Sequence, residues 1–344
     1  MARAAQKNPI DPEEWLRRLP KAELHLHLEG SITPETLVEL SRRNDTQALA
    51  LSDARALYQY RDFPSFLMSF KAITERLRTP ADYELITYNM LRDLTQQGVV
   101  HAEAYISIGI LYRFGRLDVD EVMAAVEQGR TRAEQEFGIT LLWLIDAVRH
   151  FGAEEADRVF KKAAALREIY PSVVGIGIGG DEAGGPAALF REHYKEAKAT
   201  GLHLTAHAGE AVGPESIWSA INIGAERLGH VLTAIRDPQL IEVLAEKQIP
   251  VELNITSNLR TGCCPSLEEH PVIDYFNRGL MVTLNSDDPP MFGSNLLEEY
   301  VLAHTQLGLT LEQMRELAAN SIEASFLAPE KKLALLAKVE QFEE

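Results

Sequence analysis

The chain contains very little cysteine: Cys263 and Cys264 are the only two among its 344 residues, and they are adjacent. Adjacent cysteines have poor geometry for a structural disulfide, and free thiols are typical of proteins in reducing compartments. No stretch approaches the ~20 consecutive apolar residues that a transmembrane helix needs. The first residues, Met1 to Asn8, are polar and lack the apolar core of a signal peptide. We therefore expect a cytoplasmic protein with no membrane partner.

Basic residues are also scarce relative to acidic ones. Lys and Arg together number 34 against 51 Asp and Glu, which gives a net charge of −17. Nucleic acids and anionic membranes favour basic patches, so neither is expected as the main partner. A small-molecule substrate remains compatible with this charge, because its site is set by local residues. The sequence does not indicate an oligomeric state.

Short apolar segments alternate with amphipathic ones along most of the chain. Near-continuous apolar strands separated by helices indicate a parallel sheet covered by helices, and eight such units favour a (β/α)8 barrel. We predict one domain over residues 1–344, with a helical insertion at about 44–80 and extra C-terminal helices. The insertion is rich in aromatic residues and is interpreted as packed helices that can also act as a lid. The expected strands lie at about 23–28, 99–107, 139–148, 173–177, 202–206, 226–228, 249–253 and 280–284.

The stretch 23–30, with the sequence ELHLHLEG, alternates apolar and ionisable residues as a strand does. His25 and His27 would therefore share one face at the end of the first strand. Neutral histidine is the commonest nitrogen ligand of zinc, so the pair can hold one metal ion. The alternative is that one or both histidines are structural, since so short a motif often occurs by chance.

Further ionisable residues follow the later strands. They are Gly180-Asp181-Glu182 after the fourth strand, His207 and Glu210 after the fifth, His230 after the sixth, and Asp287 and Asp288 after the eighth. Because active sites of such barrels lie at the carboxyl ends of the strands, these residues predict a metal site there. Five other histidines are expected to be surface or packing residues: His150, His193, His203, His270 and His304.

The residue types favour one zinc ion. Three imidazoles and one carboxylate suit zinc or a similar divalent ion, and do not suit magnesium or calcium. A lysine that could be carbamylated to bridge two metals is missing from residues 173–182, so one ion is expected. Glu210 is placed to transfer protons, while His230 and Asp288 could take the proton from a water molecule and orient it.

The ordered motifs HLHLEG, GDE, HAGE, RLGH, TSN and SDDP closely resemble those of the adenosine deaminase family of zinc-dependent amidohydrolases. The resemblance covers nearly the whole chain, from Pro20 onward. It implies a zinc ion bound by His25, His27, His207 and Asp287. It also implies that Glu210 protonates N1 of a purine, that His230 positions and helps to deprotonate the attacking water, that Asp288 accepts a hydrogen bond near N7, and that the backbone N–H of Gly180 contacts N3.

Departures from the family pattern concern the sugar end of the substrate. Glu29 stands where adenosine deaminases usually have an aspartate that contacts the ribose 5′-hydroxyl. The end of the second strand, 104–109, also lacks the usual Arg-Tyr-Ser-Pro pattern. Ser257 and Arg260 are further candidates for substrate contacts, and a rim arginine could bind a carboxylate or remain solvated.

Deamination of a 6-aminopurine nucleoside is the leading functional hypothesis. The alternatives on similar substrates are deamination of aminodeoxyfutalosine in menaquinone biosynthesis and deamination of adenine, the latter disfavoured by the GDE motif. Phosphoester hydrolysis is disfavoured because only one metal set is visible. An inactive purine-binding relative would be expected to lack a ligand or Glu210, and every such position is filled.

Overall fold

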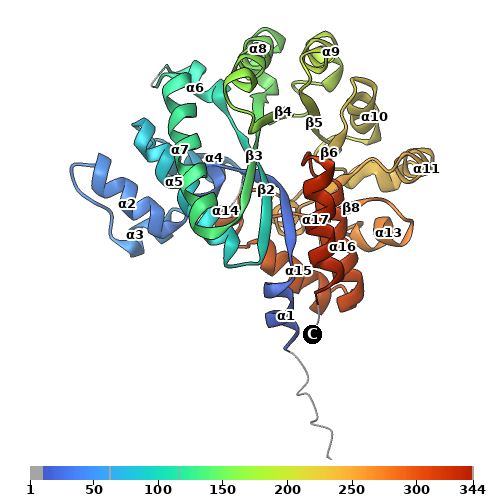
Figure 1. Ribbon diagram of the computed structural model, residues 1–344. Helices are drawn as coiled ribbons and strands as arrows, with labels where there is room; N and C mark the ends of the chain where they lie inside the picture. The colour runs from blue at the N-terminus through green and yellow to red at the C-terminus, as the bar shows by residue number, and fades with distance from the viewer. Residues whose placement is uncertain (1–10, 62, 116, 343–344) are drawn as a thin grey trace, which may run out of the picture.

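Eight parallel strands form the centre of the molecule, in the order in which they occur in the chain (Figure 1). The computed structural model describes residues 11–61, 63–115 and 117–342. The strands are β1 (Lys21–His27), β2 (Val99–Ile106), β3 (Thr140–Val148), β4 (Val173–Gly179), β5 (His203–Ala208), β6 (Arg227–His230), β7 (Val251–Leu253) and β8 (Val282–Leu284).

The sheet closes on itself directly after β8. A parallel bridge joins Leu26 to Asp287, with hydrogen bonds of 3.0 Å from the N–H of His27 to Asp287 and from the N–H of Asp287 to His25. The first and last strands are therefore neighbours, and the predicted (β/α)8 barrel is confirmed.

Helices surround the strands on the outside (Figure 1). Thr33 caps α2 by accepting a 3.1 Å hydrogen bond from Thr36, with Pro34 in the first helical position as its fixed φ favours. The main helices are α1 (Pro12–Arg18), α2 (Pro34–Asn44), α5 (Pro80–Thr95), α7 (Val119–Phe137), α8 (Ala153–Ile169), α9 (Arg191–Ala199), α10 (Pro214–Asn222), α11 (Pro238–Lys247), α13 (Val272–Asn277), α15 (Leu296–Thr305), α16 (Leu311–Glu323) and α17 (Pro329–Glu340). No helix in the described ranges is both long and apolar enough to cross a membrane.

Several helices differ from the sequence pattern. The short helices α6 (Ile108–Phe114) and α12 (Ile255–Arg260) follow β2 and β7 without having been predicted. The segment 268–278 is predicted as a helix, but α13 starts only at Val272. Pro271 explains the later start, because the residue before a proline is disfavoured in helical conformation.

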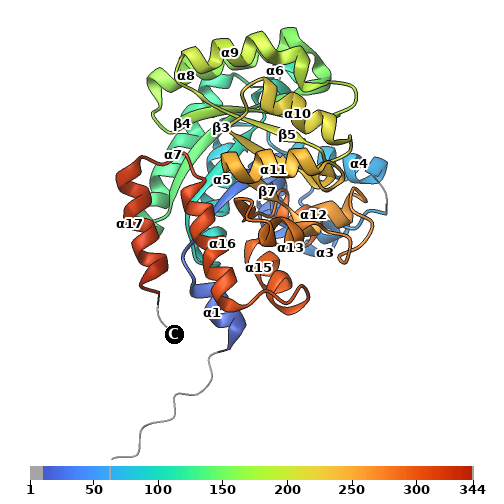
Figure 2. The ribbon, with the colours of Figure 1, turned by 90° about the vertical axis from the view of Figure 1, so that its right-hand side faces the viewer.

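Two short helices, α3 (Leu51–Ala56) and α4 (Phe63–Thr74), lie between α2 and α5. The hydroxyl of Tyr60 donates to the carbonyl of Met291 over 2.7 Å, and Phe66 stacks on Phe292 with ring centroids 5.6 Å apart. Both partners belong to α14 (Pro289–Phe292), which directly follows the Asp-Asp motif. The α4 helix and the residues just before it therefore pack at the carboxyl ends of the strands, and Figure 2 shows α4 on the opposite side of the molecule from α17.

The amino ends of the strands are closed by the loop between α16 and α17. Its Ala324 carbonyl accepts a 3.1 Å hydrogen bond from Arg227, and the N–H of Phe326 donates to Glu103. The Arg227 guanidinium lies 4.3 Å from the centre of the Phe326 ring. This loop thus covers the amino end of the barrel, so an active site can open only at the carboxyl end.

Candidate active site

Four residues predicted as metal ligands meet at the carboxyl end of the barrel. His25 and His27 lie on β1, His207 on β5, and Asp287 directly after β8. The Nε2 atom of His27 is 3.3 Å from Nε2 of His207 and 3.4 Å from Oδ1 of Asp287, and the same oxygen is 3.7 Å from Nε2 of His25. The structure therefore brings the predicted set together.

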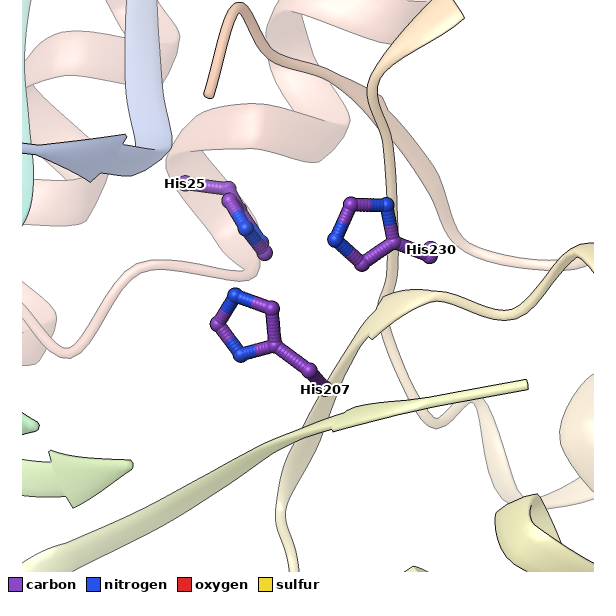
Figure 3. Close-up of side chains that lie close together, drawn as sticks. All are labelled: His25, His207 and His230. Atoms are coloured by element: carbon purple, nitrogen blue, oxygen red, sulfur yellow. The ribbon is translucent and has the colours of Figure 1, made fainter. Parts of the chain in front are cut away.

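His230 also points into this cluster. Figure 3 shows the rings of His25, His207 and His230 turned toward one another from β1, β5 and β6. Ligand atoms of these three residues lie within 4.8 Å of one another, as do those of His25, His27 and Asp287. By distance alone, His230 therefore belongs to the cluster as much as the predicted ligands do.

The donor atoms fit a divalent cation. Nε2 of His25 is buried and has no hydrogen-bond partner within the described residues, so an unused lone pair faces the cluster. Burial lowers the pKa of His25 and His207 well below the usual value and that of His27 to about 4. Neutral imidazoles with free lone pairs are the form that a metal ion binds.

Partners outside the cluster fix the ligands. Glu252 on β7 lies 2.7 Å from Nδ1 of His25, the carbonyl of Ile178 lies 3.1 Å from Nδ1 of His207, and the hydroxyl of Ser257 donates to Asp287 over 2.7 Å. Each contact leaves the opposite atom of the ligand directed inward, as partners of metal ligands commonly do. Glu252 was not predicted from the sequence, although an acid between Val251 and Leu253 in an apolar strand indicates a buried side chain.

Glu252 is part of a buried ion-pair network beneath the cluster. Nε of Arg227 donates to Glu252, and Nη1 donates to Glu103 over 2.7 Å. All three side chains are fully buried. Burial is the largest single influence on Glu103 and would raise its pKa, but the Arg227 charge, the contact with His101 and the N–H of Phe326 together lower that pKa to about 2.

Glu210 faces His230 across 3.7 Å. Burial, followed by the charge of Glu182, raises the pKa of Glu210 to about 7, so part of its population carries a proton at neutral pH. The thiol of Cys263 lies 3.9 Å from the other oxygen of Glu210. A carboxyl group with this pKa is suited to proton transfer near neutral pH.

Asp288 lies against the turn after β1. A Cβ atom built on Gly30 would fall 1.6 Å from Oδ1 of Asp288, so this approach requires glycine. Burial, and then the neighbouring Asp287, raises the pKa of Asp288 well above its usual value. Asp287 itself has φ of 67°, a left-handed conformation that non-glycine residues rarely adopt and that clusters at functional sites.

A chain of hydrogen bonds sets the proton position on His230. The N–H of Val272 donates to Nδ1 of His270 over 3.4 Å, Nε2 of His270 meets the oxygen of Asn258 at 3.1 Å, and the Asn258 amide nitrogen lies 2.9 Å from Nδ1 of His230. Nδ1 of His230 is then an acceptor, which places its proton on Nε2, facing the cluster. His270, expected from the sequence to be a packing residue, therefore has this orienting contact.

The GDE motif supports the loop that carries Glu210. The carboxylate of Glu182 accepts hydrogen bonds of 2.5, 2.9 and 3.1 Å from the backbone N–H groups of Gly209, Ala211 and Val212. Gly180 has φ of +90°, and a Cβ atom there would fall 3.0 Å from Nδ1 of His150, which accepts from the N–H of Asp181 at 3.2 Å.

The remaining predicted contacts lie farther out. Glu29 is buried, accepts a 3.3 Å hydrogen bond from the N–H of Ser107, and has its pKa raised by burial to about 7. Arg260 is exposed, with its guanidinium 5.3 Å from the centre of the Tyr60 ring. Asp146 at the end of β3 is buried beside Glu29 and was missed by the sequence analysis.

Comparisons with known proteins found a family model, curated relatives and solved structures that match nearly the whole chain. The family model described as adenosine deaminase matches residues 20–342. An aminodeoxyfutalosine deaminase of Streptomyces avermitilis is 38% identical over 96% of this chain and 93% of its own length, and an adenine deaminase of Ectopseudomonas mendocina is 35% identical over 90% and 98%. A crystal structure of an amidohydrolase from Burkholderia ambifaria, with bound zinc, has a TM-score of 0.87 at 26% identity and covers 98% of this chain and 95% of that one.

Proposed function

Because the chain belongs to the adenosine deaminase family, whose members are hydrolytic deaminases acting on C–N bonds, we propose that it deaminates a 6-aminopurine nucleoside with one zinc ion. The product would be the 6-oxopurine nucleoside, and the amino group would leave as ammonia. The observation that carries this proposal is the convergence of a metal-binding cluster with a carboxyl group whose pKa is about 7.

His25, His27, His207 and Asp287 would hold the ion, and zinc-binding by a structural neighbour supports this choice of metal. A bound zinc ion lowers the pKa of a water molecule toward neutrality. His230, with its proton on Nε2, would donate a hydrogen bond to the oxygen of the attacking water and orient it. Asp288, whose Oδ1 has no partner within the described residues, would accept a proton of that water.

Glu210 would supply the proton that activates the purine. Its protonated form would donate to N1, which makes C6 more electrophilic before water attacks. The N–H of Gly180 would contact N3, and Glu29 would face the sugar. As the C6–N bond breaks, the amino group would take the proton held by Asp288 and leave as ammonia, while the C6 hydroxyl would return its proton to Glu210 and become the carbonyl.

Aminodeoxyfutalosine is a second candidate substrate. Relatives of that name are 38–40% identical to this chain. Arg260 is exposed near the insertion and could meet a carboxylate on a long 5′ substituent. Ser257, in contrast, hydrogen-bonds Asp287, which supports a role in holding the ligand set.

The proposal is tested by measuring ammonia release from adenosine, deoxyadenosine, adenine, methylthioadenosine and aminodeoxyfutalosine with zinc-quantified protein. At least one nucleoside is expected to react. Glu210→Gln should lower kcat by about 10²–10⁴-fold while zinc is retained, because proton transfer is lost. Glu242→Gln, which removes an exposed charge on α11, should leave the rate unchanged. Absence of ammonia from every compound with a full zinc complement would refute the proposal, and reaction of adenine alone would refute the contact assigned to Gly180.

A further inference from the structure

Three adjacent strand ends carry two acids and a serine for which the proposed chemistry gives only a partial account. Glu29 follows β1, Ser107 follows β2, and Asp146 lies near the end of β3. The N–H of Ser107 donates to Oε1 of Glu29, and its hydroxyl donates to Oδ2 of Asp146, each over 3.3 Å. Ser107 therefore holds the two carboxylates side by side.

Asp146 faces the interior of the barrel next to the metal-binding cluster. It is two residues from Leu144, which packs in the interior against Tyr105, and side chains two apart on a strand share a face. A Cβ atom on Gly179 would lie 3.5 Å from Nδ1 of His207 and 3.6 Å from Oδ2 of Asp146. Asp146 therefore lies close to His207, with both side chains next to Gly179.

One oxygen of Asp146 has no donor. The residue is 3% exposed, yet its Oδ1 has no hydrogen-bond partner within the described residues. Leaving a buried carboxylate oxygen unpaired is unfavourable, and a donor supplied by a ligand would recover that free energy. This oxygen is the observation that points to a ligand.

The surroundings favour a neutral donor over an anion. Within the described ranges no lysine or arginine forms an ion pair with Glu29 or Asp146. Arg149, whose charge acts on Asp146, instead donates Nε to the carbonyl of Gly185 over 2.6 Å and Nη1 to that of His207 over 2.9 Å. A phosphate at this place would meet two acidic side chains without a paired cation, whereas a hydroxyl group would donate to the unpaired oxygen of Asp146.

We propose that Asp146, held by Ser107 beside the sugar-facing Glu29, completes a hydroxyl-recognising subsite, in which its unpaired oxygen accepts a hydrogen bond from a pentose hydroxyl and a phosphate on that pentose is disfavoured. This inference rests on the proposed function, because it takes the purine to be held at the neighbouring metal-binding cluster. It adds Asp146 as a residue that determines specificity.

The experiment compares kcat/KM of zinc-loaded wild type, Asp146→Asn and the control Glu242→Gln. The substrates are adenosine, 5′-deoxyadenosine, 2′,3′-dideoxyadenosine and adenosine 5′-monophosphate. Wild type should favour adenosine over the monophosphate by at least ~100-fold. Asp146→Asn should lower kcat/KM for adenosine by about 10–100-fold, as expected for loss of a hydrogen bond to a charged group. The loss should be smaller for the deoxy compound that lacks the contacted hydroxyl, and the control should match wild type.

Equal use of adenosine and the monophosphate by wild type would overturn the subsite, as would an equal loss for all substrates in folded Asp146→Asn. If wild type deaminates none of them, the proposed function fails, and calorimetric binding of adenosine and the monophosphate to the same zinc-loaded proteins decides the subsite. The subsite would then be supported if wild type binds adenosine more tightly than the monophosphate and Asp146→Asn abolishes this preference. Equal affinities of wild type for the two compounds would reject the subsite. Ser107→Ala, which removes one contact to Asp146, gives the same test if Asp146→Asn does not fold.

Discussion

Glu103 and Asp146 are both buried acids inside the same barrel, but their surroundings differ. Glu103, nearer the closed end, pairs with Arg227, and its pKa falls to about 2. Asp146, at the open end, has no paired cation among the described residues, and burial followed by the charge of Glu29 raises its pKa to about 7. Glu252 lies between these cases, because one oxygen meets Arg227 and the other meets His25.

This difference separates two uses of buried charge. An acid whose charge is matched within the protein contributes to the folded structure, since removing its partner leaves an isolated charge in a poor solvent. An acid without a partner costs stability and is retained where a substrate, a metal or a proton supplies what is missing. The difference predicts which substitutions act on folding, on metal binding and on pH dependence.

The largest effect is expected at the closed end. Arg227→Met leaves Glu103 and Glu252 buried without their cation, and should lower the free energy of unfolding by about 3–5 kcal/mol. Denaturant unfolding followed by circular dichroism measures this loss. The control is Arg278→Met, which breaks an exposed pair with Asp274 and should cost less than about 1 kcal/mol. If both variants lower the free energy of unfolding by similar amounts, the buried network contributes no more to stability than an exposed ion pair.

An intermediate effect is expected at Glu252. Glu252→Gln keeps the shape of the side chain but weakens the hold on Nδ1 of His25, and should reduce zinc affinity by about 10–100-fold. Competition with a chromogenic chelator measures the affinity, with Glu242→Gln as the exposed control. Unchanged affinity in a folded Glu252→Gln protein would mean that this acid serves the ion-pair network alone.

The smallest effect concerns pH. Because the pKa of Asp146 is raised in the folded state, the folded protein binds the extra proton, and stability falls as pH rises from about 4 to about 7. Asp146→Asn removes that loss, so in metal-free protein it should change stability little at pH 4 and increase it by about 1–2 kcal/mol at pH 8. Urea unfolding at both pH values measures the difference. The control is Asp53→Asn, which changes an exposed acid; an equal response of both variants would contradict the assignment to burial.

The sequence predicted the barrel and the residues that meet at its open end, because strand ends and metal-ligand residue types are both visible in it. His207 and Asp287 lie close to His25 because the carboxyl ends of parallel strands all lie at the same end of the barrel. Several residues that support the site were not predicted. Glu252, Asn258 and Asp146 act through partners on other strands, and which side chains meet across a barrel depends on strand register and loop geometry.

The insertion shows a similar limit. Its aromatic residues indicate packed helices, but the partners of Tyr60 and Phe66 lie in α14, more than two hundred residues later in the chain. Periodicity reports which face of a helix is apolar, and it contains no information on the distant surface that covers that face.

The bridge between Leu26 and Asp287 also has a consequence during synthesis. Residues 25 and 287 are neighbours in space but 262 positions apart, so their pairing is among the contacts with the greatest separation in the chain, and such contacts form late. A nascent chain that ends before β8 holds His25, His27 and His207 but not the aspartate that would complete the set. Metal binding with the affinity of the full-length protein would therefore require that β8 has paired with β1. Measured in a translation system, that affinity would show when the barrel has closed.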